Sequence, residues 1–184
     1  MAMQIDAVTG FYPSPNSLIP LSPHLHNGLL IVGSLAVVSI LVTFITLISI
    51  AFQYIVGGKH ATRSSSYNQC VTLLANLLIA DLIQSISFSI SFHWRAVNGI
   101  QAPTTYCYVQ AGFLNGGDLA SGSFVLIIAL HTAYSVIRKK TIVHKHFIRI
   151  VIAVWIVATI MTISGPLARG ADFFARAGNW VCLL

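Results

Sequence analysis

Two aspartates lie inside stretches of sequence that are otherwise apolar enough to cross a lipid bilayer. Asp81 belongs to LLANLLIADLIQSISFSIS, which begins at Leu73, and Asp118 belongs to a later apolar run. Each lies 11 residues from one end of its run. Because a helix rises about 1.5 Å per residue, both carboxylates are expected about 16 Å deep, near the midplane. A charged aspartate at that depth costs at least about 2.5 kcal/mol, so both should face a polar cavity or partner inside a helical bundle.

A serine and two amides extend this polar region. Ser121 follows Asp118 by three residues, almost one helical turn, which places its hydroxyl on the same side of the helix as the carboxylate. Asn76 and Gln84 flank Asp81 in the earlier run. The functional interpretation is a site for a cation, a proton or a ligand. The alternative is a hydrogen-bonded network that only packs helices together.

The elements that would position these residues are four apolar runs. The chain has 184 residues, of which 56% are hydrophobic and 8% charged, whereas soluble domains are about 25% charged. The runs cover about 28–56, 70–93, 107–137 and 147–168. Each exceeds the roughly 20 residues needed to cross the hydrocarbon core, and a helix satisfies its own backbone there. We therefore predict an all-α polytopic membrane bundle with four transmembrane helices, and not an enzyme.

The basic residues orient this bundle. The chain has ten Lys and Arg against four Asp and no Glu, which gives a formal charge of +6. Seven of the ten lie in the connections 57–69 and 138–149, three lie in the opposite connections, and the N-terminal tail has none. The positive-inside rule then places the N-terminus outside and these two connections in the cytosol. Because the charges fall between apolar runs, they indicate topology and not nucleic-acid binding.

The two ends of the chain and its connections complete this outline. Residues 1–27 are expected to form an exposed extracellular tail. Trp94 and Trp180 are expected in outer connections, at the membrane interface where aromatic rings are favoured. The chain stops at GNWVCLL, some 16 residues after the fourth run. That ending favours an interrupted chain.

The cysteines and one histidine each leave two interpretations open. Cys107 and Cys182 lie on the outer side, where they could form a bridge or remain two unrelated thiols. Cys70 lies at the inner end of the second run and is expected to have no chemistry. His131, near the inner end of the third run, could act as a proton-sensitive switch. The favoured alternative is an interfacial histidine with a hydrogen-bonding partner.

Together these residues resemble the first four helices of a seven-helix, G-protein-coupled receptor. NLLIADL at 76–82 resembles the second-helix pattern of rhodopsin-like receptors, whose aspartate helps to bind a sodium ion, and Asp81 is the matching position. Counted inward from Cys107, Ser121 matches the serine of that sodium site. Trp155 resembles the single tryptophan of the fourth helix.

The inner end of the third run departs from the rhodopsin-like pattern. Where those receptors carry Asp-Arg-Tyr, this chain has His131, Thr132 and Ala133. IALHTAYSVI, from Ile128, and NWVCLL, from Asn179, are instead similar to fungal nutrient receptors of the glucose-sensing type. This resemblance covers roughly residues 28–184.

The resemblance implies a function and a set of site residues. It implies a plasma-membrane receptor that senses glucose or another nutrient and activates a G-protein α subunit that feeds cyclic-AMP signalling. It implies a disulfide between Cys107 and Cys182, and a sodium ion held by Asp81 and Ser121 as the only cofactor. The inner end facing the G protein would contain His131, Thr132, Arg138, Lys139 and Lys140.

Two other functions remain open. In a transporter or channel fragment, Asp81 and Asp118 would relay protons or bind a coupling ion. The sequence has no internal repeat and predicts no broken helix, which counts against a transporter. The other possibility is a complete four-helix adaptor resembling tetraspanins, which keep both termini in the cytosol.

Overall fold

The computed structural model describes residues 17–57, 65–140, 142–169, 175–177 and 181–183. These residues form the helices α1 (Pro23–Gly57), α2 (Ser65–Ser89), α3 (Ser91–Ala96), α4 (Thr105–Arg138) and α5 (His144–Arg169), and the strands β1 (Ala175–Ala177) and β2 (Val181–Leu183). Four helical segments are long and apolar enough to cross a membrane. The predicted helical architecture with four potential transmembrane helices is confirmed, and the short β1–β2 hairpin is an addition to it.

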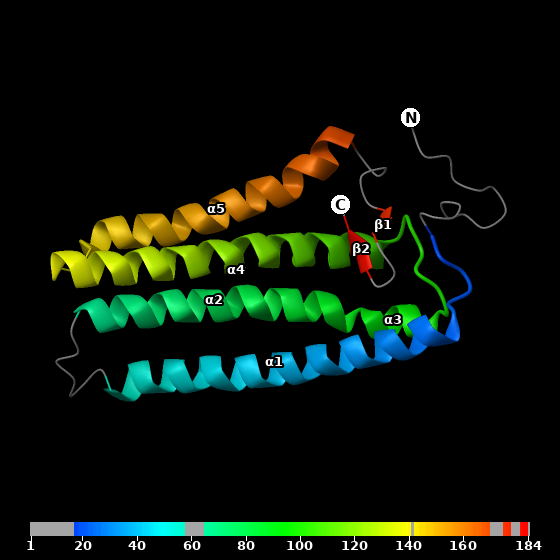
Figure 1. Ribbon diagram of the computed structural model, residues 1–184, viewed down its shortest axis with the longest axis horizontal. Coiled ribbons are helices and arrows are strands. Elements are labelled where there is room, and N and C mark those ends of the chain that lie inside the picture. Colours follow the sequence, from blue (N-terminus) through cyan, green and yellow to red (C-terminus); the bar gives the residue numbers. More distant parts are fainter. Residues whose placement is uncertain (1–16, 58–64, 141, 170–174, 178–180, 184) are drawn as a thin grey trace.

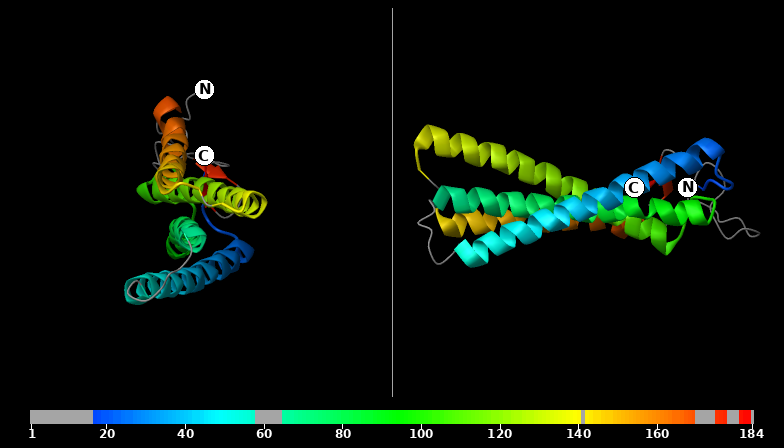
Figure 2. Two further views of the ribbon diagram at one scale, coloured as in Figure 1. Left: turned by 90° about the vertical axis from the view of Figure 1, so that its left-hand side faces the viewer. Right: turned by 90° about the horizontal axis from the view of Figure 1, so that it is seen from below.

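The four long helices lie side by side in a row, in the order α1, α2, α4, α5 (Figure 1). In the left view of Figure 2, α1 and α5 again lie at the two ends of the row, and in the right view α1 crosses the other helices obliquely. The broadest contact joins α2 to α4, while α3 packs on α1 and β2 packs on α4. We call the end that holds α3 and the hairpin the outer end, and the opposite end, where α4 finishes, the inner end.

Two buried clusters hold the row together. The outer cluster surrounds Trp94 and contains Leu21, Leu29, Trp94, Ile100, Ala102, Cys107 and Ala111. The inner cluster joins α2, α4 and α5 and contains Leu73, Ala80, Ala120, Phe124, Phe147, Val151, Val154 and Ala158. Many other apolar side chains are exposed along the helices, among them Leu35, Ile45 and Ile160. Such an apolar surface suits contact with lipid or with further helices.

The segment before α1 is bound to the outer end, where an exposed tail was predicted. Leu18 and Ile100 exchange two backbone hydrogen bonds of 2.9 and 3.0 Å. The Ser17 hydroxyl donates to the carbonyl of Ala102 and accepts from its amide, both at 3.1 Å. The prediction for residues 1–27 is therefore wrong where this segment pairs with the loop before α4, and α1 begins at Pro23 instead of 28. Residues 1–16 lie outside the described residues.

The second apolar run is interrupted near its outer end, where one unbroken span was predicted. α2 ends at Ser89 and α3 begins at Ser91. Trp94 on α3 is fully buried, and its indole nitrogen donates to Gln110 Oε1 at 2.8 Å. Trp94 was predicted in a connection, whereas it lies on the short helix α3 inside the buried outer cluster, where α4 provides the acceptor that a buried indole N–H requires. Trp180 lies outside the described residues.

The fourth span also begins earlier than predicted. α5 starts at His144, whereas the sequence predicted a start near 147 and a loop over 138–149. Lys145 and Arg149 therefore lie on the first turns of α5. The connection between α4 and α5 is correspondingly short.

α2 and α4 approach closely at a point where α4 has no side chain. A Cβ atom at Gly117 would lie 3.0 Å from Gln84 Cβ and 3.2 Å from the carbonyl oxygen of Ala80. At Gly112 and Gly122, a Cβ atom would have nothing within 4 Å. Since Ala80 contributes backbone to this contact, a larger residue at 117 must separate the two helices.

We expect Gly117→Ala to lower the free energy of unfolding by about 1 kcal/mol or more, because overpacking forces the backbone to shift. Gly112→Ala is the matched control, since it gains helix propensity without a new contact. Thermal unfolding of the purified proteins in detergent measures both effects. Equal midpoints for the two variants would contradict the close approach of α2 and α4.

Candidate functional site

The two membrane-depth aspartates meet polar partners across the contact between α2 and α4. Ser121 Oγ donates to Asp81 Oδ1 at 2.8 Å. Gln84 Nε2 donates to Asp118 Oδ1 in a second, short hydrogen bond. The two helices run in opposite directions, and each contributes a carboxylate and its neighbour three residues away. The two hydrogen bonds therefore lie about one helical turn apart, and we call these four residues the polar seam.

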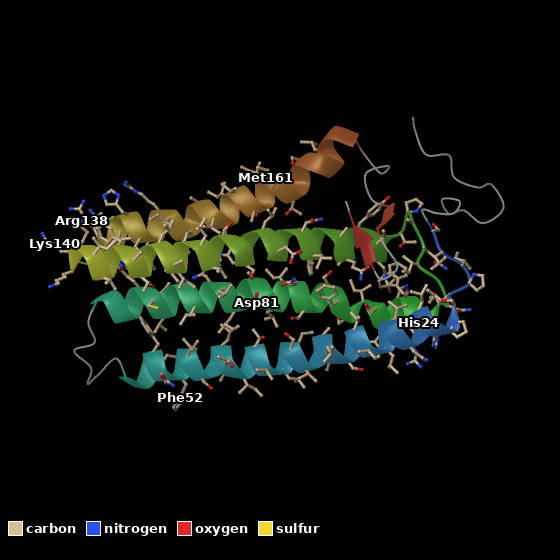
Figure 3. The ribbon with its side chains drawn as sticks, viewed as in Figure 1. His24, Phe52, Asp81, Arg138, Lys140 and Met161 are labelled. Carbon is tan, nitrogen blue, oxygen red and sulfur yellow. The ribbon has the colours of Figure 1, made fainter. Side chains whose placement is uncertain are left out.

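The two carboxylates of the polar seam differ in their exposure. Asp81 is half-buried near the middle of α2, as Figure 3 shows. Asp118 is exposed on α4 even though it accepts a hydrogen bond from Gln84. The sequence predicted one shared midplane site, whereas the structure pairs each carboxylate with a residue of the opposite helix. An exposed carboxylate at this depth needs a polar neighbour beyond these four residues.

A groove between α1 and α2 continues the polar seam toward α1. Its volume is about 420 Å³, and its lining is Val32, Leu35, Ala36, Ser39, Gln84, Ser85 and Phe88. The hydroxyls of Ser39 and Ser85 hydrogen-bond to each other at 2.9 Å. Gln84 lines this groove and also contacts Asp118, so it connects the groove to the polar seam. Polar side chains of α2 thus have hydrogen-bonding partners on two neighbouring helices.

The polar seam can accept hydrogen bonds and attract a cation. Ser121 is half-buried, and its oxygen keeps lone pairs after donating to Asp81. Among the described residues, no group of three or more His, Cys, Asp or Glu side chains is arranged to hold a metal ion. Any cation here would be held by carboxylate, hydroxyl and amide oxygens, as hard cations prefer.

A second polar contact ties α2 to α5 and was missed by sequence reasoning. Trp155 Nε1 donates to Asn76 Oδ1 at 2.9 Å, and Asn76 Nδ2 donates to the carbonyl of Thr72 at 2.8 Å. The Trp155 ring also packs against Phe124 of α4, with centroids 5.7 Å apart. In the sequence, Trp155 was notable only for its resemblance to the tryptophan of the fourth receptor helix. The overlooked signal was its indole N–H, which needs an acceptor inside a bundle.

At the inner end, His131 is a buried, hydrogen-bonded residue. It is 4% exposed, and its Nε2 lies 2.9 Å from Gln69 Oε1. Gln69 Nε2 donates to the carbonyl of Ile142 at 2.7 Å. The His131 ring also meets Phe147 edge-on, with centroids 6.2 Å apart. This arrangement corresponds to the interfacial histidine of the two interpretations, and Gln69 is a linking residue that sequence reasoning did not identify.

The other predicted inner-end residues are exposed. The hydroxyl of Thr132 donates a hydrogen bond to the carbonyl of Ile128 in the preceding helical turn, at 2.8 Å. Arg138, Lys139 and Lys140 lie where α4 ends, and Figure 3 shows Arg138 and Lys140 at that end. Of the five residues predicted to face a cytosolic partner, His131 therefore faces inward and the other four face outward.

The cysteines occupy the ends predicted for them. Cys107 is fully buried in the first turn of α4, where its amide donates to the capping hydroxyl of Thr104 at 3.3 Å. Cys182 is the middle residue of β2, which packs on α4, and its side chain lies outside the described part. Cys70 is a half-buried free thiol on α2.

No known protein family matches the sequence, and no curated protein or solved structure is significantly similar to it. The comparisons therefore leave the resemblance to receptors as a hypothesis. Its function has to be argued from the contacts between the helices.

We expect the Asn76–Trp155 contact to contribute about 0.6 kcal/mol of coupling, the average for hydrogen bonds between membrane helices, and at most about 1.7 kcal/mol. A double-mutant cycle measures it with Asn76→Leu, Trp155→Phe and the combined variant. Unfolding in detergent gives the four free energies. Strictly additive losses would contradict an energetic link between α2 and α5.

Proposed function

We propose that the protein is a G-protein-coupled receptor and that its four potential transmembrane spans are the first four of seven. It senses glucose or another nutrient at the plasma membrane and signals through a G-protein α subunit to cyclic AMP. The observation that carries this proposal is the 2.8 Å hydrogen bond between Ser121 and Asp81. These two residues match, in the sequence, the serine and aspartate of the sodium site of rhodopsin-like receptors.

The contact of Trp155 supports the same proposal. Trp155 resembles the single tryptophan of the fourth receptor helix, and its hydrogen bond reaches across to Asn76 of α2. This bond and the polar seam together keep α2 in contact with both α4 and α5. A receptor needs such fixed neighbours, because a ligand can favour one helix arrangement only through contacts that differ between two defined states.

The exposure of Asp118 supports a bundle larger than a row of four helices. Its carboxylate lies at membrane depth on a face that the described helices leave open. A charged group at this depth is expected to face a protein interior or a water-filled cavity. Three further helices would close this face and convert the polar seam into the interior of the bundle.

The polar seam provides a mechanism for switching. A sodium ion held by Asp81 and Ser121 would stabilise the helix arrangement in which those oxygens converge. Loss of the ion would release the other arrangement. At the inner end, His131 occupies the position where receptors of the rhodopsin type carry an aspartate. Its hydrogen bond to Gln69 would take the place of the contacts that hold the inner end of those receptors together. The exposed Arg138, Lys139 and Lys140 would then face the α subunit.

We also propose the disulfide between Cys107 and Cys182. Cys107 is buried where β2 packs on α4, and Cys182 is the central residue of that strand. A bridge here would attach the segment after α5 to the outer end of α4. It would thereby shape the mouth through which a nutrient reaches the bundle.

A transporter is the second candidate, and the break between α2 and α3 is the observation that favours it. Transporters use interrupted helices to hold substrates and ions. In those proteins the interruption lies near the bilayer midplane, whereas Ile90 follows the midplane residue Asp81 by nine positions, about 14 Å along the helix. The receptor therefore remains the better interpretation.

We expect the complete seven-helix protein, of which residues 1–184 are the first part in this proposal, to raise cyclic AMP when glucose is added to host cells that lack their own glucose receptor. Replacing external sodium with choline should shift the half-maximal glucose concentration by about fivefold or more, the usual size of an allosteric coupling. Asp81→Asn should abolish the sodium effect, and Asp118→Asn is the matched control that should retain it. Nutrient uptake that persists without a G protein and vanishes in Asp118→Asn would instead favour the transporter.

We expect an N-terminal epitope tag to be reached by antibody on intact cells. A tag inserted after Lys140, between α4 and α5, should be reached only after permeabilisation. The start of α1 and the end of α5 both lie at the outer end, so the geometry is compatible with either orientation, and the basic residues decide between them. A cytosolic N-terminal tag would rule out the receptor and favour the four-helix adaptor.

A further inference from the structure

Five basic side chains gather on the inner end of the molecule. The last turn of α4 and the residues that follow it contribute Arg138, Lys139 and Lys140, and the first turns of α5 contribute Lys145 and Arg149. All five are exposed. Because α4 and α5 pack against each other and are joined by a short connection, the five cations share one surface, which we call the inner basic surface.

No carboxylate balances this charge within the described residues. The acidic side chains of the described part are Asp81 and Asp118, which both belong to the polar seam at membrane depth. The first turn of α5 contains no acidic residue. His144, Lys145 and His146 instead lie near the positive end of the α5 dipole, where cations are unfavourable. The surface therefore gains stability when an anion neutralises it.

The depth of the inner basic surface identifies the kind of anion. Its cations lie in the terminal turns of two potential membrane-spanning helices or directly after them. That position corresponds to the lipid headgroup layer and not to the aqueous space beyond it. Clusters of four to eight Lys and Arg directly beside a membrane span are typical sites for anionic lipids. A headgroup with several phosphates can neutralise more of the five cations at once than a singly charged headgroup can.

We propose that the inner basic surface binds the headgroup of a polyphosphorylated phosphatidylinositol in the cytosolic leaflet. The proposal rests on the orientation proposed above, in which the inner end is cytosolic. Arg138, Lys139 and Lys140 contact the headgroup from α4, and Lys145 and Arg149 contact it from α5. The lipid thereby bridges the ends of two helices that have only a short connection between them.

Binding of this lipid is coupled to the core of the inner end. The carbonyl of Ile142, in the connection between the basic residues, accepts the hydrogen bond from Gln69 of α2. Gln69 also contacts the buried His131 of α4. A headgroup that holds the connection in place therefore stabilises the contact of α2 with α4 and α5. The lipid acts as a regulator of the same inner end that is proposed to face the G protein.

The test uses the purified protein in nanodiscs of phosphatidylcholine and a fluorescent, short-chain phosphatidylinositol bisphosphate as the probe. Fluorescence anisotropy measures its binding. The charge-removing variant combines Lys139→Asn, Lys140→Gln and Lys145→Gln, with Asn chosen because Lys139 has a positive φ of 49° that asparagine tolerates. We expect the affinity to fall about a hundredfold, since each basic residue near the surface contributes about fivefold.

Two controls make the result specific. Lys139→Arg, Lys140→Arg and Lys145→Arg together preserve the charge and should bind the probe like the unmodified protein. A short-chain phosphatidylserine probe should bind much more weakly than the bisphosphate. Equal binding by the charge-removing variant, equal binding of the two probes, or binding of an acidic peptide but not of the bisphosphate would each overturn the proposal. No G protein is present in this assay, so its failure is distinct from failure of the cyclic-AMP and epitope-tag experiments.

Discussion

The close approach of α2 and α4 is the constraint on which the rest of the structure depends. Within hydrocarbon, a polar group that finds no partner in the protein is costly, so a helix with polar side chains must bring them to another helix. The absence of a side chain at Gly117 brings the backbone of Ala80 close to α4. This proximity allows Ser121 to reach Asp81. The remaining long helices then add to this pair, α1 on α2 and α5 on α4.

The two ends of the molecule are stabilised in different ways. At the outer end, the segment before α1, α3 and the start of α4 surround Trp94, and its indole hydrogen bond to Gln110 lies in a fully buried cluster. At the inner end, one hydrogen-bonded chain runs from His131 through Gln69 to the connection before α5. The polar seam lies between these ends. A change at the outer end can therefore reach the inner end through the same two helices that carry the aspartates, if that pair has two arrangements.

The sequence predicted the four long helices well because their length and apolarity are properties of single segments. It also predicted that Asp81, Asp118 and Ser121 would face a helical neighbour, since lipid is a poor environment for a carboxylate. It failed where the outcome depends on partners far along the chain. The burial of Trp94, the break before α3 and the docking of residues 17–21 all arise from contacts with α4 or with the loop before it. No local pattern encodes those contacts.

The residues of the candidate site were also predicted only in part, because their partners on the opposite helix were not. Spacing along one helix indicated that Asp118 and Ser121 share a side, but it could not indicate which residue of α2 each would meet. That choice depends on the relative translation of two antiparallel helices, and a shift of one turn would place Asp81 opposite Asp118 or Gln84 opposite Ser121 instead. The role of Gln69 in linking α4 to the connection before α5 could not be predicted for a similar reason, because an amide at a helix end has many possible partners. Its two hydrogen bonds can form together only when the fold brings the connection between α4 and α5 beside it.

The unequal surroundings of the two aspartates define what the polar seam can do. Asp81 has a hydroxyl partner on α4 and is half-buried, so its carboxylate has a defined oxygen neighbour on the opposite helix. Asp118 has an amide partner and remains exposed, so its surroundings depend on whatever covers that face. Asp81, with its fixed partner, favours one helix arrangement. Asp118, with its exposed carboxylate, responds to a change of neighbour. Because Gln84 and Asp81 lie one turn apart on the same helix, a new neighbour for Asp118 that displaces Gln84 acts directly on the helix that holds Asp81.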